Sequence, residues 1–163
     1  MTKNWKAWVV LGLRILFGVL LIQASFDKLV KPIDFAQMVT NYRIPLFLTP
    51  EFSRWVGIWL PYVEICVGVF LILGIWLDAV IIINLILMVI FTTLVTQAFA
   101  RGLDISCGCF AVEEDAPKIG IGKILENFTL TALSIWCVVM VFKNRQLQET
   151  LTIFSIPFKK KQI

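Results

Sequence analysis

The sequence predicts an all-α fold: an integral membrane four-helix bundle with a short amphipathic surface helix between the first and second spans. Of its 163 residues, 59% are hydrophobic and only 16% are charged, which is outside the usual range for a soluble domain. Four apolar stretches approach the roughly 20 residues that a helix needs to cross a bilayer core. No remaining stretch is long enough for an independent soluble domain, so we expect a single membrane domain over residues 1–163.

The four expected spans are residues 8–26, 55–77, 79–100 and 124–142. A tight turn at Leu77–Asp78 separates the second span from the third. Tryptophans fall near the expected ends of the spans, as in the aromatic belts of membrane proteins: Trp5, Trp8, Trp55, Trp59 and Trp76.

The basic residues outside the spans predict the topology. They gather at the two chain ends, at Lys3 and Lys6 and at Lys143, Arg145 and Lys159 to Lys161. The positive-inside rule then places the N- and C-termini in the cytoplasm, in a multi-pass protein of the cell's inner (cytoplasmic) membrane. We therefore read the charge of +4 as a topology signal in a lipid bilayer, with no nucleic-acid partner. Arg14 interrupts the first apolar stretch, which favours a permanent helix over a signal peptide.

A short helix is expected between the first two spans, at about residues 33–42. Phe35, Met38, Val39 and Tyr42 recur at the spacing of one helix face, and Pro32 suits a first helical turn. Such a helix lies on the outer membrane surface. It either covers the bundle or roofs a pocket at the outer ends of the spans.

The loop at residues 101–123 contains Cys107-Gly108-Cys109-Phe110 and is expected to face the oxidising side of the membrane. Two thiols this close can form a strained disulfide, which is a labile one. The alternatives are a structural clip or two thiols without a role. The chain has no histidine, which excludes histidine relays, histidine-ligated haem and mixed His/Cys zinc sites, and we expect no metal site.

Charged residues near or within the spans are the other site candidates, because ionisable groups in a membrane are costly. Arg14 and Glu64 lie deepest, and their depths differ by about 6 Å at 1.5 Å per residue, which predicts a buried ion pair. That pair either fixes helix packing or helps to bind a cofactor. Lys28 is a candidate cation for a thiolate of the loop, and Glu126 is a candidate proton acceptor beside it.

The other two cysteines, Cys66 and Cys137, fall at similar depths within spans. They are either a second thiol pair or, as we favour, small buried hydrophobic residues.

Several parts of the sequence resemble the DoxX-like membrane proteins: Arg14–Gly18, Lys28, Lys31–Phe35, Pro61–Glu64 and Cys107–Phe110. The resemblance at Cys107–Phe110 points to the MauE branch of that family. Ser25 departs from the glycine expected before the lysine. The resemblance implies a four-helix, redox-associated membrane protein that works with a thioredoxin-like partner to mature a disulfide-rich periplasmic enzyme.

On this resemblance we expect a membrane thiol–disulfide oxidoreductase. Cys107 and Cys109 would exchange electrons with a thioredoxin-like or other extracytoplasmic thiol protein. By analogy with DsbB and the vitamin K epoxide reductases, the membrane acceptor would be a quinone. Two alternatives are a non-catalytic scaffold or maturation factor for a periplasmic partner, and a small-molecule or ion carrier that uses Arg14 and Glu64. The sequence leaves the direction of electron flow and the oligomeric state open.

Overall fold

A computed structural model describes residues 3–41, 50–102 and 120–143. The regular elements within these ranges are helices, which confirms the predicted all-α class. They are α1 (Lys3–Val30), α2 (Pro32–Asn41), α3 (Pro50–Leu73), α4 (Leu77–Ala100) and α5 (Ile121–Lys143). Four of them are long and apolar enough to cross a membrane, and α2 is the short helix predicted between the first two spans.

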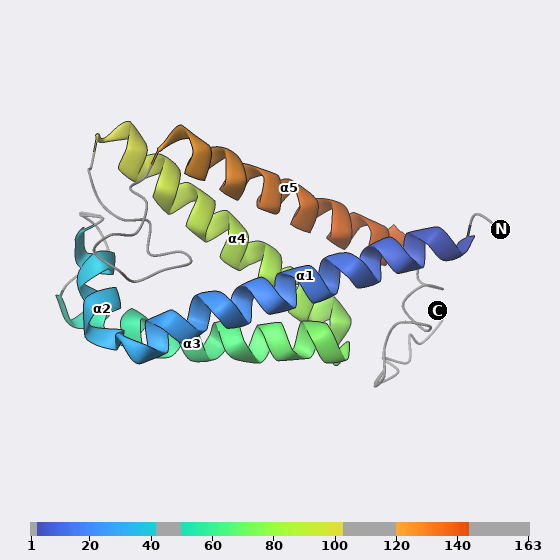
Figure 1. Cartoon of the computed structure of the whole chain (residues 1–163), viewed down its shortest axis with the longest axis horizontal. Helices are drawn as coiled ribbons and strands as arrows, with labels where there is room; N and C mark the ends of the chain where they lie inside the picture. The colour runs from blue at the N-terminus through green and yellow to red at the C-terminus, as the bar shows by residue number, and fades with distance from the viewer. Residues whose placement is uncertain (1–2, 42–49, 103–119, 144–163) are drawn as a thin grey trace, which may run out of the picture.

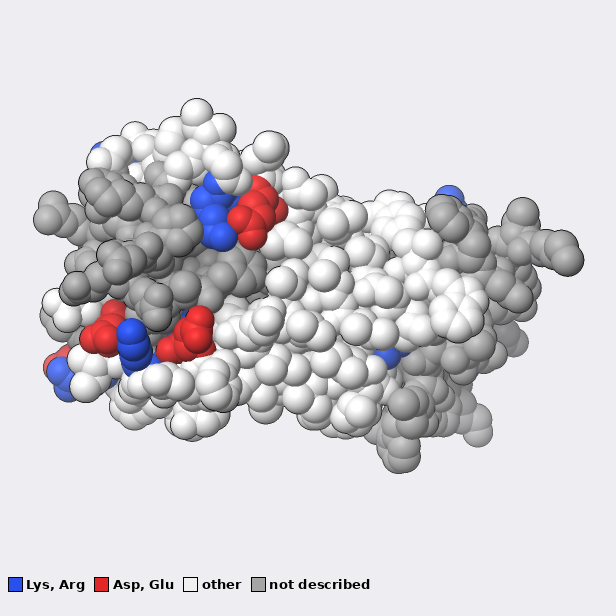
Figure 2. Space-filling view, viewed as in Figure 1, with Lys and Arg blue, Asp and Glu red and all other residues white. Residues whose placement is uncertain are grey.

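The lengths and surfaces of the long helices suit a bilayer. Their apolar segments have 23 or 24 residues, about 35 Å at 1.5 Å per residue, and they expose many large hydrophobic side chains. Figure 2 shows charged side chains gathered at the end where α2 lies and an almost uncharged band across the middle of the molecule. The protein is therefore a multi-pass membrane protein.

The long helices form two antiparallel pairs, α1 with α3 and α4 with α5 (Figure 1). The pairs diverge toward the α2 end of the molecule, and α1 begins at the same end at which α5 finishes. In the α1–α3 pair the backbones approach closely, because a Cβ atom added to Gly18 would lie 2.8 Å from the Gly68 carbonyl oxygen. Close contact at small residues is the usual way in which membrane helices pack.

The turn between α3 and α4 lies at Gly74–Trp76, three residues before the predicted turn at Leu77–Asp78. Gly74 and Trp76 have φ angles of 72° and 47°, in the left-handed region that ends helices. The amides of Gly74 and Ile75 both donate to the Phe70 carbonyl oxygen. The position of this turn is not evident from the composition, because Ile75 and Trp76 are apolar and Leu77 is buried in the core.

The short helix α2 is fixed against the start of α3. Phe35 is buried, whereas Ile33 on the other side of α2 is exposed. A Cβ atom added to Gly57 would lie 2.8 Å from the Cβ of Ala36, so only glycine allows this approach. Thr40 donates a hydrogen bond to Ser53 at 2.8 Å. Of the four residues predicted to share one face of this helix, Tyr42 lies outside the described residues.

Candidate functional site

The Cys107-Gly-Cys109 motif lies outside the described residues. The helix ends on either side of this segment, Ala100 of α4 and Ile121 of α5, lie at the α2 end of the molecule (Figure 1). The site geometry that the structure gives is therefore that of the helices at this end.

A buried ion pair joins the last turn of α1 to the middle of α3. The Nζ atom of Lys28 donates to both carboxylate oxygens of Glu64, at 2.6 and 2.9 Å, and both side chains are 0% exposed. Ser25, one turn before Lys28, donates to the same carboxylate at 2.9 Å. Three hydrogen bonds from two neighbouring side chains thus compensate the Glu64 charge, which a buried carboxylate requires.

Two aromatic rings complete the surroundings of Lys28. Its Nζ atom lies 5.1 Å from the ring centroid of Phe35 on α2 and 4.9 Å from that of Phe91 on α4. Both distances are typical of cation–π contacts. Lys28 therefore links α1, α2, α3 and α4 at one point, and its charge is neutralised within the protein.

The predicted Arg14–Glu64 ion pair is wrong. The Nε and Nη2 atoms of Arg14 donate to the Leu71 carbonyl oxygen, at 3.0 and 2.9 Å. Leu71 lies in the last turn of α3, where carbonyl groups lack partners within the helix and the helix dipole is negative. Arg14 thus caps the end of α3 inside the membrane. The prediction failed because it compared depths counted from uncertain span ends, whereas Glu64 lies at the level of Lys28.

Glu126 stands apart from the buried ion pair. It lies at an exposed position near the start of α5 and accepts a hydrogen bond from Lys123 at 2.9 Å. Its side chain is 47% exposed, and its described bond stays on α5. The structure therefore does not bring Glu126 together with Lys28, Glu64 and Arg14.

The two cysteines within the described helices do not form a pair. Cys66 is exposed on α3, whereas Cys137 is buried on α5, and both are free thiols. Cys137 packs in the hydrophobic core, as expected for a small hydrophobic residue, whereas the expected burial is wrong for Cys66, which lies on an outward face of α3.

Buried neutral residues that the sequence analysis did not assign to the site join α4 to α5. Thr92 contacts Thr131 at 2.7 Å and donates to the Asn127 carbonyl oxygen at 3.3 Å. Deeper, Asn84 donates to Ser134 at 3.0 Å, and its own carbonyl oxygen has no partner within the described residues. Threonine and asparagine at helical spacing on both helices are the signal that could have revealed this interface.

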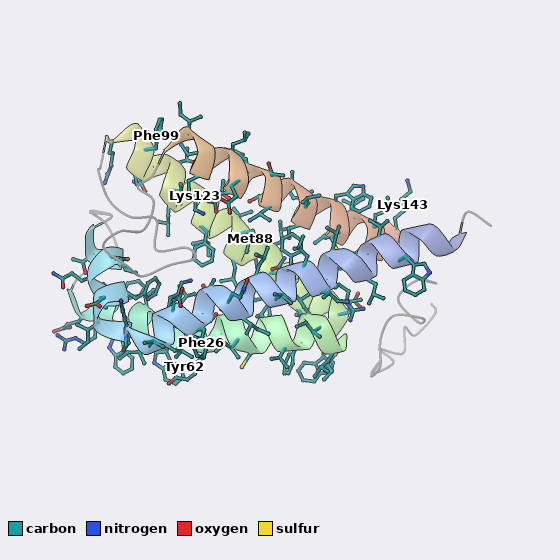
Figure 3. All side chains as sticks on the ribbon, viewed as in Figure 1. Phe26, Tyr62, Met88, Phe99, Lys123 and Lys143 are labelled. Carbon is teal, nitrogen blue, oxygen red and sulfur yellow. The ribbon has the colours of Figure 1, made fainter. Side chains whose placement is uncertain are left out.

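A small cavity lies between α1, α4 and α5. Its lining is apolar apart from Asn127 and includes Phe17, Leu21, Met88 and Phe91. Figure 3 shows Met88 between α4 and α1. The free space is about 10 Å³, the room of one water molecule. This cavity is too small for a quinone ring.

Comparison with known proteins gives the family. The family model of the methylamine utilisation protein MauE matches residues 6–140, most of the chain and all four long helices in large part. No curated protein and no solved structure matches the chain. The matched region includes Arg14, Lys28, Glu64 and the Cys107-Gly-Cys109 motif. The chain therefore belongs to the MauE family of methylamine utilisation proteins.

Proposed function

We propose that this protein is a membrane thiol–disulfide redox protein that exchanges electrons with an extracytoplasmic thioredoxin-like protein through Cys107 and Cys109. One observation carries the proposal: the helix ends that hold the Cys-Gly-Cys segment lie at the end of the bundle where Lys28, Glu64 and Ser25 form a buried polar cluster. A buried ion pair in a membrane is costly, and such pairs mark functional regions. Membership of the MauE family supports a role beside a periplasmic partner.

The exchange proceeds through a mixed disulfide. A thiolate of the reduced partner attacks the Cys107–Cys109 disulfide, an intermolecular S–S bond forms, and one cysteine leaves as a thiolate. The partner's second thiol then attacks the intermolecular bond. The partner becomes oxidised, and Cys107 and Cys109 become two thiols. The same steps in reverse reduce a partner, and the relative reduction potentials set the direction.

The reduced pair must then pass two electrons to a membrane acceptor. A quinone is a class of acceptor that takes two electrons and two protons, but the cavity between α1, α4 and α5 is too small for its ring. We therefore derive no step through a quinone and assign Arg14 and Glu64 no contact with one.

Lys28 acts in this proposal as a positioning residue. Because Glu64 neutralises it and neither side chain is exposed, its charge has little effect on a thiolate outside the cluster. Its contacts with Phe35 and Phe91 instead hold α2 and α4 in fixed places at the end of the bundle where the helix ends that flank the Cys-Gly-Cys segment lie. Glu126, exposed near the start of α5, remains our candidate proton acceptor for the pair.

The positions of the helix ends support an orientation in the membrane. The chain enters α1 and leaves α5 at one end of the bundle, where Lys3, Lys6 and Lys143 lie. By the positive-inside rule we propose that this end faces the cytoplasm of the inner membrane. The α2 end and the cysteine segment then face outward, toward an oxidising compartment.

Single-cysteine variants test the function. With Cys107→Ser or Cys109→Ser, the remaining thiol should trap a thioredoxin-fold probe protein as a mixed disulfide, seen by non-reducing electrophoresis. The double serine variant, which keeps Cys66 and Cys137, should trap none. If the double variant still supports the partner's maturation in cells, the protein is a scaffold and the redox proposal is wrong.

A further inference from the structure

The cavity between α1, α4 and α5 is lined by a hydrogen-bonding group without a partner. Asn127 is only 3% exposed, and its amide nitrogen donates to the Lys123 carbonyl oxygen at 2.9 Å. Because only the nitrogen of an amide can donate to a carbonyl, this bond fixes which end of the side chain is the oxygen. Within the described residues that oxygen accepts no hydrogen bond, and Asn127 lines the cavity. A buried acceptor without a donor is costly, so its presence here requires an explanation.

A water molecule is a poor partner for this oxygen. The free space of about 10 Å³ has room for one, but a buried water usually makes about three hydrogen bonds. The rest of the described lining is apolar, including Phe17, Leu21 and Phe91, and gives the water no further partner. The cavity is better matched by a molecule that offers a single donor and is otherwise apolar.

A comparison with Asn84 shows that an unpaired oxygen alone does not define such a site. The side-chain oxygen of Asn84 also lacks a partner within the described residues, but it is enclosed by packed atoms and Asn84 does not line this cavity. Asn127 combines an unpaired oxygen with free space beside it. We therefore treat Asn127 as a candidate ligand-binding residue and Asn84 as a packing residue.

The depth of Asn127 restricts the kind of molecule that can supply the donor. Asn127 lies six residues after Ile121, where the apolar segment Ile121–Lys143 begins, which is about 9 Å at 1.5 Å per residue. The head groups of lipids lie outside the hydrocarbon core, so their hydroxyl and amine groups stay above this level. A hydroxyl at the depth of Asn127 belongs to a molecule that dissolves in the hydrocarbon as a whole.

The described space is too small for a ring, so such a molecule enters only if the cavity widens. The helices of each pair pack along much of their length, whereas the two pairs diverge toward the α2 end (Figure 1). The cavity lies at the junction of the pairs, and its lining residues Leu20, Phe91 and Leu130 are only half-buried. Met88, which Figure 3 shows between α4 and α1, has a flexible side chain that adapts to a ligand.

We propose that this cavity is the closed form of a binding site for a lipid-soluble molecule that carries a hydroxyl group. The hydroxyl donates to the Asn127 side-chain oxygen, and the apolar body packs against Phe17 and Met88 as the α4–α5 pair moves away from α1. The site is separate from the Lys28–Glu64 ion pair, whose groups are bonded to each other and 0% exposed. Binding here requires neither cysteine of the Cys-Gly-Cys motif, so the site goes beyond the proposed thiol exchange.

Methyl NMR of the methionines tests the site in the whole chain. Protein with isotope-labelled methionine methyl groups is placed in nanodiscs and titrated with para-cresol or with para-xylene, in which a methyl group replaces the hydroxyl. With both concentrations expressed per lipid, para-cresol should shift the Met88 signal to saturation. The signals of Met38 and Met140, which do not line the cavity, should stay unchanged. The affinity for para-xylene should be about 5- to 10-fold lower, the loss expected for one hydrogen bond.

Two variants separate the hydrogen bond from the cavity. Asn127→Leu keeps a similar volume and removes the oxygen, so para-cresol should bind this variant as weakly as para-xylene does. Ala24→Leu fills the cavity, whose lining includes Ala24, and should abolish the Met88 shift with either compound. Asn84→Leu, the matched change outside the cavity, should leave the affinity for para-cresol within about twofold. Unchanged Met38 and Met140 signals show that each variant is folded.

Several results would overturn the proposal. They are no Met88 shift with para-cresol in the wild-type chain, equal affinities of the wild type and Asn127→Leu, and equal shifts of all three methionines. A Met88 shift produced by dioleoylglycerol, whose hydroxyl lies at head-group level, would contradict the depth argument and assign the site to lipids. The titration can be repeated with Cys107 and Cys109 both replaced by serine, so this site and the thiol exchange fail separately.

Discussion

The α1–α3 pair buries charged side chains, whereas the α4–α5 pair, where it is described, buries neutral polar ones. Arg14, Lys28 and Glu64 belong to the first pair, and Asn84, Thr92 and Ser134 belong to the second. Each charge of the first pair has a matched group: a carboxylate with an ammonium, and a guanidinium with a helix end. The α1–α3 pair is therefore stabilised by buried charged interactions that are costly to break, whereas the α4–α5 pair is stabilised by weaker hydrogen bonds between neutral side chains.

Removal of one partner of the buried ion pair should have the largest effect. Lys28→Met leaves Glu64 charged and buried, which should lower the free energy of unfolding by about 3–5 kcal/mol. Glu64→Met should cost a similar amount. Unfolding in mixed micelles, followed by circular dichroism, measures both.

The double variant Lys28→Met with Glu64→Met is the control, because it removes both charges at similar volume. It should recover most of the lost stability. Additive losses in the double variant would show that the two side chains are not energetically coupled. The reduction potential of Cys107 and Cys109 in this variant sharpens the comparison, since a shift would show that the cluster positions the cysteine segment and does more than stabilise the helices.

The close approach of α1 and α3 should give the next largest effect. A Cβ atom at Gly18 would lie 2.5 Å from the Cγ1 atom of Ile72, so Gly18→Leu forces the helices apart. We expect a loss of about 1–3 kcal/mol in the same unfolding assay. Gly122→Ala, where an added Cβ meets nothing within 4 Å, should change stability by less than about 1 kcal/mol. Equal effects at the two glycines would contradict the packing described here.

Loss of the hydrogen bonds that one side chain makes between α4 and α5 should have the smallest effect. Thr92→Val keeps the side-chain shape and removes its bonds to Thr131 and Asn127. The expected loss is about 0.6 kcal/mol for each bond, the average for such bonds within membranes. Thr93→Val removes only a bond to its own helix and should cost less. A loss as large as that of Lys28→Met would erase the contrast between the two helix pairs.

The sequence predicted the fold well because hydrophobic length and helical spacing are local properties. The four spans, the short helix α2 and the deep charges were all visible in it. The partner of Glu64 was not visible in the sequence. Pairing depends on how far each helix is shifted along the membrane normal relative to its neighbour, and counting residues from the span ends gives that shift only to about one helical turn. Lys28 and Ser25 lie three residues apart on one helix face, a spacing that could have indicated the cluster but was not used to predict it.

The Thr92 contacts between α4 and α5 and the turn at Gly74–Trp76 escaped prediction for a different reason. Thr92 is surrounded by apolar residues, so hydropathy treats it as part of a span. The turn contains Ile75 and Trp76, which hydropathy likewise cannot distinguish from the helices on either side. The predicted roles of Cys107 and Cys109 remain predictions, because both residues lie outside the described ranges.

A redox titration of the purified protein in nanodiscs tests the proposed function most directly. Alkylation followed by mass spectrometry reports the thiol or disulfide state of Cys107 and Cys109 at each potential, with Cys66 and Cys137 as internal references. The account predicts a reversible Cys107–Cys109 disulfide with an oxidising potential. Two thiols that never pair, or a disulfide that resists reduction throughout, would contradict it.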